Sequence, residues 1–174
     1  MSRFDISLER VLKHEGGFVH DLFDSGGITN MGVTKRVWEE FVGHPVSEAD
    51  MRNLTVEKVS KLYKQRYWDR VQADKLPKGV DYVVFDFAIN AGVGRAVKTL
   101  QSTAGSNPDG IIGNQTLARV NAMDAKELVN QYSDARVDFY QGIVARKPDQ
   151  ARFIKGWLNR VEDARKSGLE DYNA

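Results

Sequence analysis

The most apolar stretch of the chain, residues 80–90, places the strongest constraint on the fold. Only Asp81, Asp86 and Asn90 introduce charged or amide side chains into it. Eleven residues are too few to cross a membrane, and no apolar run of about 18 residues occurs anywhere in the chain. The stretch must therefore be buried on most of its faces inside a protein core. Periodicity alone allows a strand or a helix there, and we predict a helix.

Amphipathic helical patterns occur on both sides of this buried segment. Several begin with a residue typical of a helix N-cap, namely Asp5, Thr34, Thr55 and Asp124. The patterns predict helices over residues 5–15, 34–42, 55–70, 95–104 and 124–147, a short helix after Gly113 and a last helix after Pro148. The glycine-rich residues 16–32 predict a loop or a short β-hairpin. We therefore expect a mainly α-helical protein.

Several classes of function are excluded by residues and motifs that the sequence lacks. Without cysteine, the chain has no disulfide, no thiolate metal site and no cysteine nucleophile. His14, His20 and His44 do not form a metal-binding arrangement, and no glycine-rich phosphate loop is present, so we predict no metal and no cofactor. The formal net charge of +1 is spread along the chain without a basic block, which argues against nucleic acid as a partner.

Glu15 is the first candidate for a catalytic residue. It follows Leu8, Val11 and Leu12 at helical spacing, so it lies at the end of the stripe that enters the core. Partial burial and the negative end of the helix dipole both disfavour a charged carboxylate there. Cleavage of a glycosidic bond needs a carboxyl that keeps its proton, because the leaving oxygen has to be protonated. The alternative is an end-of-helix residue that reaches solvent over the two following glycines.

Polar residues of the glycine-rich segment are candidates for the partner of Glu15. Asp21 and Asp24 follow it by six and nine residues, and a hairpin that returns beside the helix end would place either one opposite it. Glycosidases pair an acid with an ionised carboxylate, and we favour Asp24 for that role. An aspartate beside glycine is also a common turn former, which we favour for Asp21. Thr29 and Thr34 are candidates for a hydroxyl near the cleft, with helix capping as the alternative for Thr34.

These candidates lie within longer motifs that resemble a known family. The motifs are His14-Glu-Gly-Gly-Phe-Val-His-Asp21 and Asp24-Ser-Gly-Gly-Ile-Thr-Asn-Met-Gly-Val-Thr34. They look like the opening of glycoside hydrolase family 108, which comprises N-acetylmuramidases found as phage endolysins and as bacterial proteins implicated in protein export. The run Phe85-Asp-Phe-Ala-Ile-Asn-Ala-Gly-Val-Gly-Arg-Ala96 is similar to an internal helix of that family. Asp109-Gly-Ile-Ile-Gly-Asn-Gln-Thr-Leu117 resembles the start of its C-terminal peptidoglycan-binding region.

The resemblance implies a lysozyme-like helical fold in which the glutamate of Glu-Gly-Gly, here Glu15, is the catalytic acid. It implies a catalytic region over residues 1–92 and a peptidoglycan-binding region over residues 93–174, which we expect to pack as one compact domain. The expected reaction is hydrolysis of the β-1,4 bond between N-acetylmuramic acid and N-acetylglucosamine. The alternatives are a lytic transglycosylase that acts on the same bond and a non-catalytic wall-binding protein.

Further residues are candidates for substrate binding. The Asn90 amide is expected to bind an N-acetyl group, with a buried amide that caps the helix end as the alternative. Asp86 lies on the same helix face, where the two residues are expected to share a polar network. Tyr67 and Trp68 are candidates for stacking on sugar rings, although aromatic residues at helical spacing belong more often to a core. The complete predicted substrate-binding set is Asp21, Thr29, Thr34, Tyr67, Trp68, Asp86 and Asn90.

The first residues of the chain lack the apolar core of a secretory signal. We therefore expect synthesis in the cytoplasm and action on the cell wall, in the periplasm, after release by a holin-like pore or another export partner. The expected partners are the glycan strands of peptidoglycan, bound by a monomer without stable membrane insertion. A role in phage lysis and a role in bacterial secretion both fit this expectation.

Overall fold

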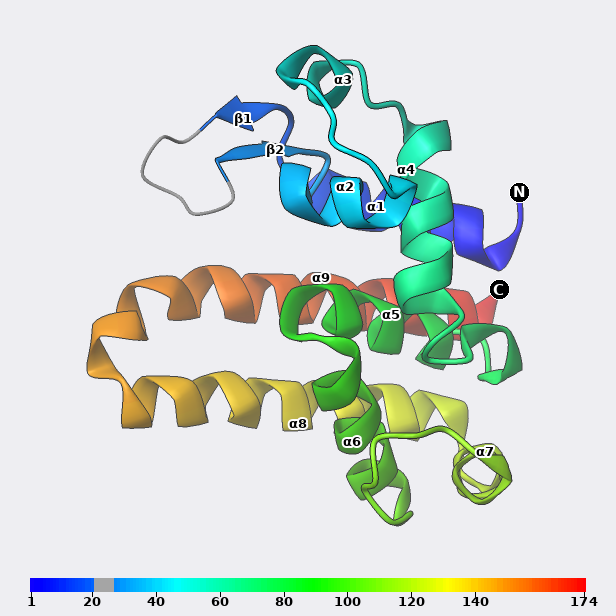
Figure 1. Ribbon diagram of the computed structural model, residues 1–174. Helices are drawn as coiled ribbons and strands as arrows, with labels where there is room; N and C mark the ends of the chain where they lie inside the picture. Colours follow the sequence, from blue (N-terminus) through cyan, green and yellow to red (C-terminus); the bar gives the residue numbers. More distant parts are fainter. Residues whose placement is uncertain (21–26) are drawn as a thin grey trace. The chain divides into compact units, whose positions relative to one another are not determined.

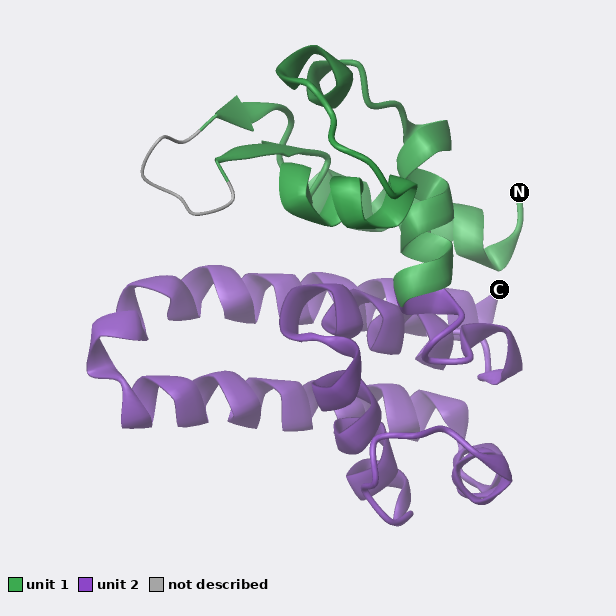
Figure 2. Cartoon of the chain, viewed as in Figure 1, with its two compact units in different colours: residues 1–66 green, residues 67–174 purple. Residues whose placement is uncertain are grey.

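The computed structural model describes residues 1–20 and 27–174, and it confirms a mainly α-helical fold (Figure 1). The chain forms two compact units, residues 1–66 and residues 67–174 (Figure 2). The division differs from the expected regions 1–92 and 93–174. The reason is α5 (Val80–Ala91), which packs against helices that follow it in the chain and so belongs to the second unit.

The first unit begins with α1 (Arg3–His14), which is capped by Ser2. The Ser2 hydroxyl oxygen accepts the N–H of Asp5 at 3.1 Å, and the Asp5 carboxylate accepts the N–H of Ser2 at 3.0 Å. The predicted cap at Asp5 is therefore wrong, because Asp5 is the acidic partner in a capping box that starts three residues earlier. Phe4, Leu8 and Val11 are buried, as the apolar stripe predicts.

A small antiparallel sheet follows α1 and confirms a β-structure in the glycine-rich segment. Its strands are β1 (Val19–His20), β2 (Ile28–Asn30) and β3 (Val33–Thr34), in the order β1-β2-β3. Thr29 is opposite Val19 on one side and opposite Thr34 on the other. Met31 and Gly32 connect β2 to β3 with φ angles of 51° and 77°. Two consecutive positive φ angles are characteristic of the tight type I′ hairpin turn.

Three helices complete the first unit. Thr34 caps α2 (Lys35–Val42) by accepting the N–H of Val37 at 3.1 Å, and Gly43 ends this helix as predicted. Ser47 caps α3 (Glu48–Arg52), and Thr55 caps α4 (Val56–Tyr63). The predicted helix over residues 55–70 does not continue regularly, because a π-helical turn, η1 (Lys64–Trp68), replaces it after Tyr63.

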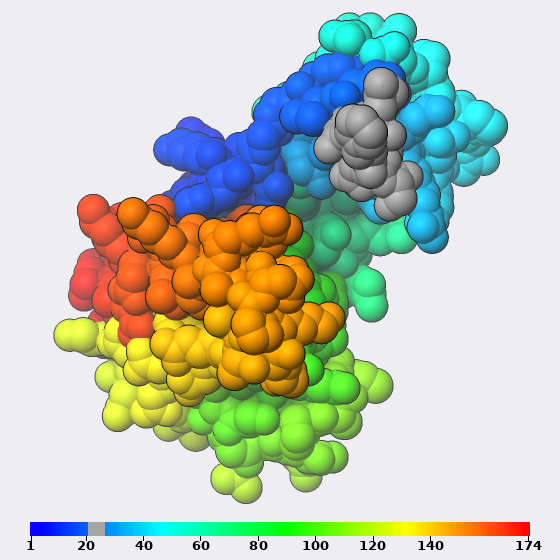
Figure 3. All heavy atoms as spheres, turned by 90° about the vertical axis from the view of Figure 1, so that its left-hand side faces the viewer, coloured from blue at the N-terminus to red at the C-terminus, as the bar shows by residue number. Residues whose placement is uncertain are grey.

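The second unit is a helical bundle around α5. Val80 to Ala88 are all buried, which confirms the prediction of a helix enclosed on most faces. The other elements are η2 (Ala73–Lys75), α6 (Val93–Ala104), α7 (Asn114–Ala122), α8 (Ala125–Arg146), η3 (Pro148–Phe153) and α9 (Ile154–Asn173). The long helices α8 and α9 lie side by side (Figure 1). Their connection η3 has no buried residue and faces the viewer in Figure 3, in orange.

Two glycines bring α5 directly onto α9. Gly79 precedes α5 with a φ of +93°, and a Cβ atom there would collide with the Gly168 carbonyl of α9. A Cβ atom on Gly168 would fall 2.9 Å from Cγ1 of Val83. The backbone conformation at Gly79 and the missing side chains at both positions thus allow the close approach.

A buried polar network joins α5 to α8 and α9. Asp86 is fully buried, and its carboxylate accepts from Arg136 Nη1 at 2.7 Å and from Arg160 Nη2 at 3.0 Å. Arg136 also donates to the Tyr140 hydroxyl, which donates to the side-chain oxygen of Asn90. The predicted network of Asp86 and Asn90 is therefore present, through two residues of α8. Burial raises the pKa of Asp86, but the two guanidinium groups outweigh it and bring the pKa below its usual value.

Replacing Asp86 should destabilise the second unit strongly. Asp86→Asn leaves two largely buried guanidinium groups without a counter-charge, so the free energy of unfolding at pH 7 should fall by about 3–5 kcal/mol in urea denaturation. Asp134→Asn is the control, because Asp134 pairs with Arg165 at 2.6 Å but is 71% exposed, and its loss should cost less than about 1 kcal/mol.

A comparison of wild type with Asp86→Asn at different pH values gives a second test of the network. The pKa of Asp86 is lower in the folded than in the unfolded protein. Its contribution to the free energy of unfolding is therefore complete above the unfolded pKa of about 3.9 and is lost as the pH falls through the folded pKa. The difference in the free energy of unfolding between wild type and Asp86→Asn should therefore become smaller below about pH 4. Equal stabilities at pH 7 would show that the network does not stabilise the unit.

Candidate active site

Glu15 is the first residue beyond α1. Its N–H still donates to the carbonyl of Val11 at 3.2 Å, but its backbone is extended, with φ −88° and ψ 138°. The side chain is half-buried. The apolar stripe of α1 therefore ends in a carboxyl that is partly withdrawn from water.

The Glu15 carboxyl lies against the turn between β2 and β3. A Cβ atom built on Gly32 would fall 2.9 Å from both Cγ and Oε2 of Glu15, and 2.6 Å from the hydroxyl oxygen of Tyr63. The missing side chain of Gly32 thus provides the space in which the carboxyl and the phenol oxygen lie. Gly32 is itself exposed, so this arrangement is at the protein surface.

Two hydrogen bonds between the hairpin and neighbouring helices support the turn. The Tyr63 hydroxyl, at the end of α4, donates to the carbonyl of Met31 at 2.7 Å. The Asn30 amide donates to the carbonyl of Met51 in α3 at 2.9 Å, and both residues are buried. The residues of the turn and Glu15 therefore come together from α1, the sheet and α4.

The two threonine candidates face each other in the sheet. Thr29 in β2 is opposite Thr34 in β3, and both are half-buried. The Thr34 hydroxyl oxygen caps α2, which confirms the helix-capping alternative for this residue. Thr29, Thr34 and Glu15 lie in the same unit. Asp21 and Asp24 lie outside the described residues, so their roles stay predictions.

The four remaining candidates belong to the second unit, and two of them lie in its interior. Trp68 is fully buried, its Nε1 donates to Asp74 at 2.9 Å, and its ring meets Phe85 edge to face. The core alternative therefore holds for Trp68, which has no exposed ring face for a sugar. Asp86 is equally buried and paired with two arginines, so a direct contact with substrate is not supported.

Tyr67 and Asn90 remain accessible. Tyr67 is half-buried, and Asn90 is exposed at the end of α5. The side-chain oxygen of Asn90 accepts from Tyr140, which fixes the orientation of the amide and leaves its NH₂ group as the donor for a ligand.

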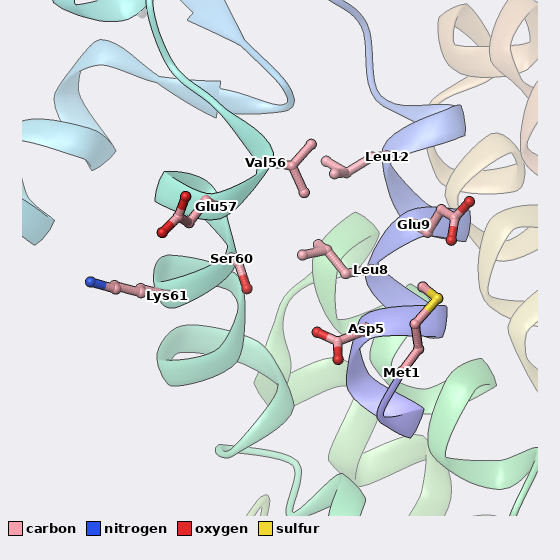
Figure 4. Close-up of a pocket in the computed structure, with 9 residues that line it drawn as sticks. All are labelled: Met1, Asp5, Leu8, Glu9, Leu12, Val56, Glu57, Ser60 and Lys61. Carbon is pink, nitrogen blue, oxygen red and sulfur yellow. The ribbon is translucent and has the colours of Figure 1, made fainter.

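The groove between α1 and α4 has a different chemistry from the surroundings of Glu15. Leu8 and Leu12 of α1 face Val56 of α4 across it, as Figure 4 shows. Its other lining residues are Met1, Asp5, Glu9, Glu57, Ser60 and Lys61. None of the predicted site residues that the structure describes lines this groove, and its apolar centre offers few partners for the hydroxyl and amide groups of a glycan. The candidate active site is therefore the surface around Glu15.

Over residues 1–20 and 27–174, no cluster of three or more histidine, aspartate or glutamate side chains is placed to hold a metal ion. None of the described helices combines the length and the hydropathy of a membrane span.

Met31, Gly32 and Tyr63 were not among the residues predicted for the site. The sequence Asn30-Met31-Gly32 between Ile28 and Val33 is a typical turn signal, so the turn itself was detectable. Tyr63 lies on the apolar stripe of its helix and is indistinguishable there from a core residue. Its bond to Met31 spans 32 residues, and no local pattern reports such a contact.

Comparisons with known proteins identify the family of the chain. Residues 8–92 match the family described as glycosyl hydrolase 108, and residues 95–162 match a predicted peptidoglycan domain. None of the curated proteins matches the chain.

A solved structure, that of SagA from Brucella abortus, is similar over almost the full length. It shares 38% sequence identity with the chain, covers 98% of this chain and 96% of its own, and superposes with a TM-score of 0.85. The family match over residues 8–92 includes the Glu-Gly-Gly motif and the strands β2 and β3. The chain therefore belongs to the glycosyl hydrolase 108 family, and it is a peptidoglycan-degrading glycosidase.

Proposed function

We propose that the protein is a muramidase that hydrolyses the β-1,4 bond between N-acetylmuramic acid and N-acetylglucosamine, with Glu15 as its general acid. The position of the Glu15 carboxyl carries this proposal. It is half-buried at the end of an amphipathic helix and lies against the bare Cα of Gly32, which is itself exposed at the surface. A glutamate that meets a glycosidic oxygen can act as a general acid by protonating it.

The proposed reaction follows the general scheme of glycoside hydrolysis. Glu15 donates its proton to the bridging oxygen while the bond from this oxygen to C1 of N-acetylmuramic acid breaks. Positive charge develops at C1, and a water molecule adds its hydroxyl there and gives up a proton. In this proposal Asp24 is the second carboxylate, as a base toward that water or as a stabiliser of the positive charge.

The substrate contacts in this proposal come from polar groups that the fold leaves accessible. In the second unit, the side-chain oxygen of Asn90 already accepts a hydrogen bond from Tyr140. The NH₂ group of Asn90 is therefore the donor for the carbonyl of an N-acetyl group. Within the first unit, Thr29 and Thr34 supply hydroxyl groups in the sheet whose β2–β3 turn contacts Glu15. Tyr67 belongs to the second unit and stays a prediction for stacking on a sugar ring.

Removing the proton donor should abolish cleavage. Glu15→Gln keeps the size of the side chain but cannot donate a proton, so lysis of purified sacculi should fall by a factor of about 10²–10⁴. The matched control is Glu9→Gln, an exposed glutamate of the same helix, which should lyse sacculi like wild type. An unchanged circular dichroism spectrum establishes that both variants are folded. Activity of Glu15→Gln above a few per cent of wild type would refute the assignment.

The reaction products separate hydrolysis from the transglycosylase alternative. Mass spectrometry of muropeptides released by the wild-type protein should show reducing-end N-acetylmuramic acid, because water adds to C1. A 1,6-anhydro product would instead assign the protein to the lytic transglycosylases. An absence of any soluble product would support a wall-binding role.

A methyl group on Gly32 should disrupt the site without unfolding the protein. Gly32→Ala places Cβ within 2.9 Å of the Glu15 carboxyl and 2.6 Å of the Tyr63 hydroxyl, so kcat/KM should fall about 100-fold. Gly43→Ala is the control, because Gly43 also has a positive φ, +84°, but no atom lies within 4 Å of a Cβ there. The positive φ should cost both variants about 1 kcal/mol of stability, Gly32→Ala should lose more because of its close contacts, and only Gly32→Ala should lose activity. Equal kcat/KM values for Gly32→Ala and Gly43→Ala would show that catalysis does not need the space left by the missing side chain of Gly32.

A further inference from the structure

We infer that the Tyr63 hydroxyl positions the catalytic carboxyl by holding the Met31–Gly32 turn closed against Glu15. The inference rests on the proposed role of Glu15 and adds a residue that acts on it through the backbone of another element. Tyr63 is a positioning residue in this account, because its partner is the turn and not the substrate.

The turn needs an external support because one of its residues is unfavourable. Met31 has a φ of 51°, in the left-handed region that residues other than glycine, asparagine and aspartate rarely adopt. Among the described residues, Gln72 is the only other non-glycine with a positive φ. A methionine in this conformation relaxes toward ordinary backbone angles unless surrounding contacts prevent it.

Tyr63 provides such a contact from a rigid element. Its hydroxyl donates to the Met31 carbonyl at 2.7 Å, and its side chain is only 2% exposed. The hydroxyl thus reaches the partly buried Met31 carbonyl from a ring that is itself enclosed by the core. The phenol ring is fixed by burial at the end of α4, where the helix changes to the π-helical turn η1.

Movement of the turn would reach Glu15 directly. Gly32 is covalently bonded to Met31, and the position of its absent Cβ is 2.9 Å from both Cγ and Oε2 of Glu15. The turn and the carboxyl thus lie in contact, with no intervening side chain. A shift of Met31 would open space beside the carboxyl and allow it to leave the orientation in which it meets a glycosidic oxygen.

Tyr63→Phe tests the inference, because phenylalanine keeps the ring and removes only the hydroxyl. We expect kcat on a defined soluble glycan to fall about tenfold or more, with KM changed far less, since the loss concerns alignment of the acid. The matched control is Tyr132→Phe. Tyr132 is fully buried in the second unit and its hydroxyl donates to the Ala96 carbonyl at 3.0 Å, so the variant loses an equivalent bond and should keep wild-type kcat.

A second substitution distinguishes positioning from general packing. Met31→Gly removes the backbone penalty of the left-handed conformation, so the turn should need the Tyr63 bond less. The fall in kcat caused by Tyr63→Phe should therefore be smaller in the Met31→Gly background than in wild type. A role of Tyr63 in core packing alone predicts the same fall in both backgrounds.

The outcomes separate this inference from the proposed function. If Glu15→Gln is inactive and Tyr63→Phe retains wild-type kcat, or if its loss is equal in both backgrounds, the positioning role is overturned and the function of Glu15 stands. If Glu15→Gln remains active, the proposed function fails and the inference fails with it. A loss in Tyr63→Phe that Met31→Gly reduces, with Tyr132→Phe unaffected, supports the inference.

Discussion

The contact between the Glu15 carboxyl and the bare Cα of Gly32 is the constraint on which the candidate site depends. It requires α1 to end at His14, the hairpin to turn at Met31 and Gly32, and α4 to end at Tyr63. A local feature marks each of these boundaries. A glycine pair follows Glu15, the hairpin turn contains the left-handed Gly32, and the helix geometry changes from α to π after Tyr63. The residues of the candidate site therefore lie at the ends of helices and in a turn between strands.

The second unit is organised around a different interaction, the buried carboxylate of Asp86. This group lies in the helix that the hydropathy pattern identifies as the centre of the core, and its two arginines come from α8 and α9. The glycosyl hydrolase match ends at residue 92 and includes this helix, whereas the helices α6, α8 and α9 that pack against it lie beyond that limit. The family boundary in sequence and the compact units in space thus divide the chain at different points. Asn90 is the accessible end of the network, which gives its amide a fixed orientation.

Much of the fold could be predicted because its signals are local. Thr34 and Thr55 cap helices where the patterns place them, and the apolar run over residues 80–90 is a buried helix. Asp5 shows the limit of such signals, since a cap and the acidic partner of a capping box use the same residue types. The positions of Trp68 and Asp86 depend on tertiary contacts, and the arginines of Asp86 lie 50 and 74 residues away in the chain. Glu15 could be named as a candidate because its helix stripe, its glycine pair and its motif coincide, whereas Tyr63 offers only a helix stripe that a core residue shares.

The most direct test of the account is a crystal structure of Glu15→Gln with a bound peptidoglycan tetrasaccharide. The side chain of residue 15 should lie within hydrogen-bonding distance, about 3 Å, of one glycosidic oxygen, with the sugar chain passing over Gly32. A sugar chain bound elsewhere, for example in the groove between α1 and α4, with no glycosidic oxygen near residue 15, would contradict it.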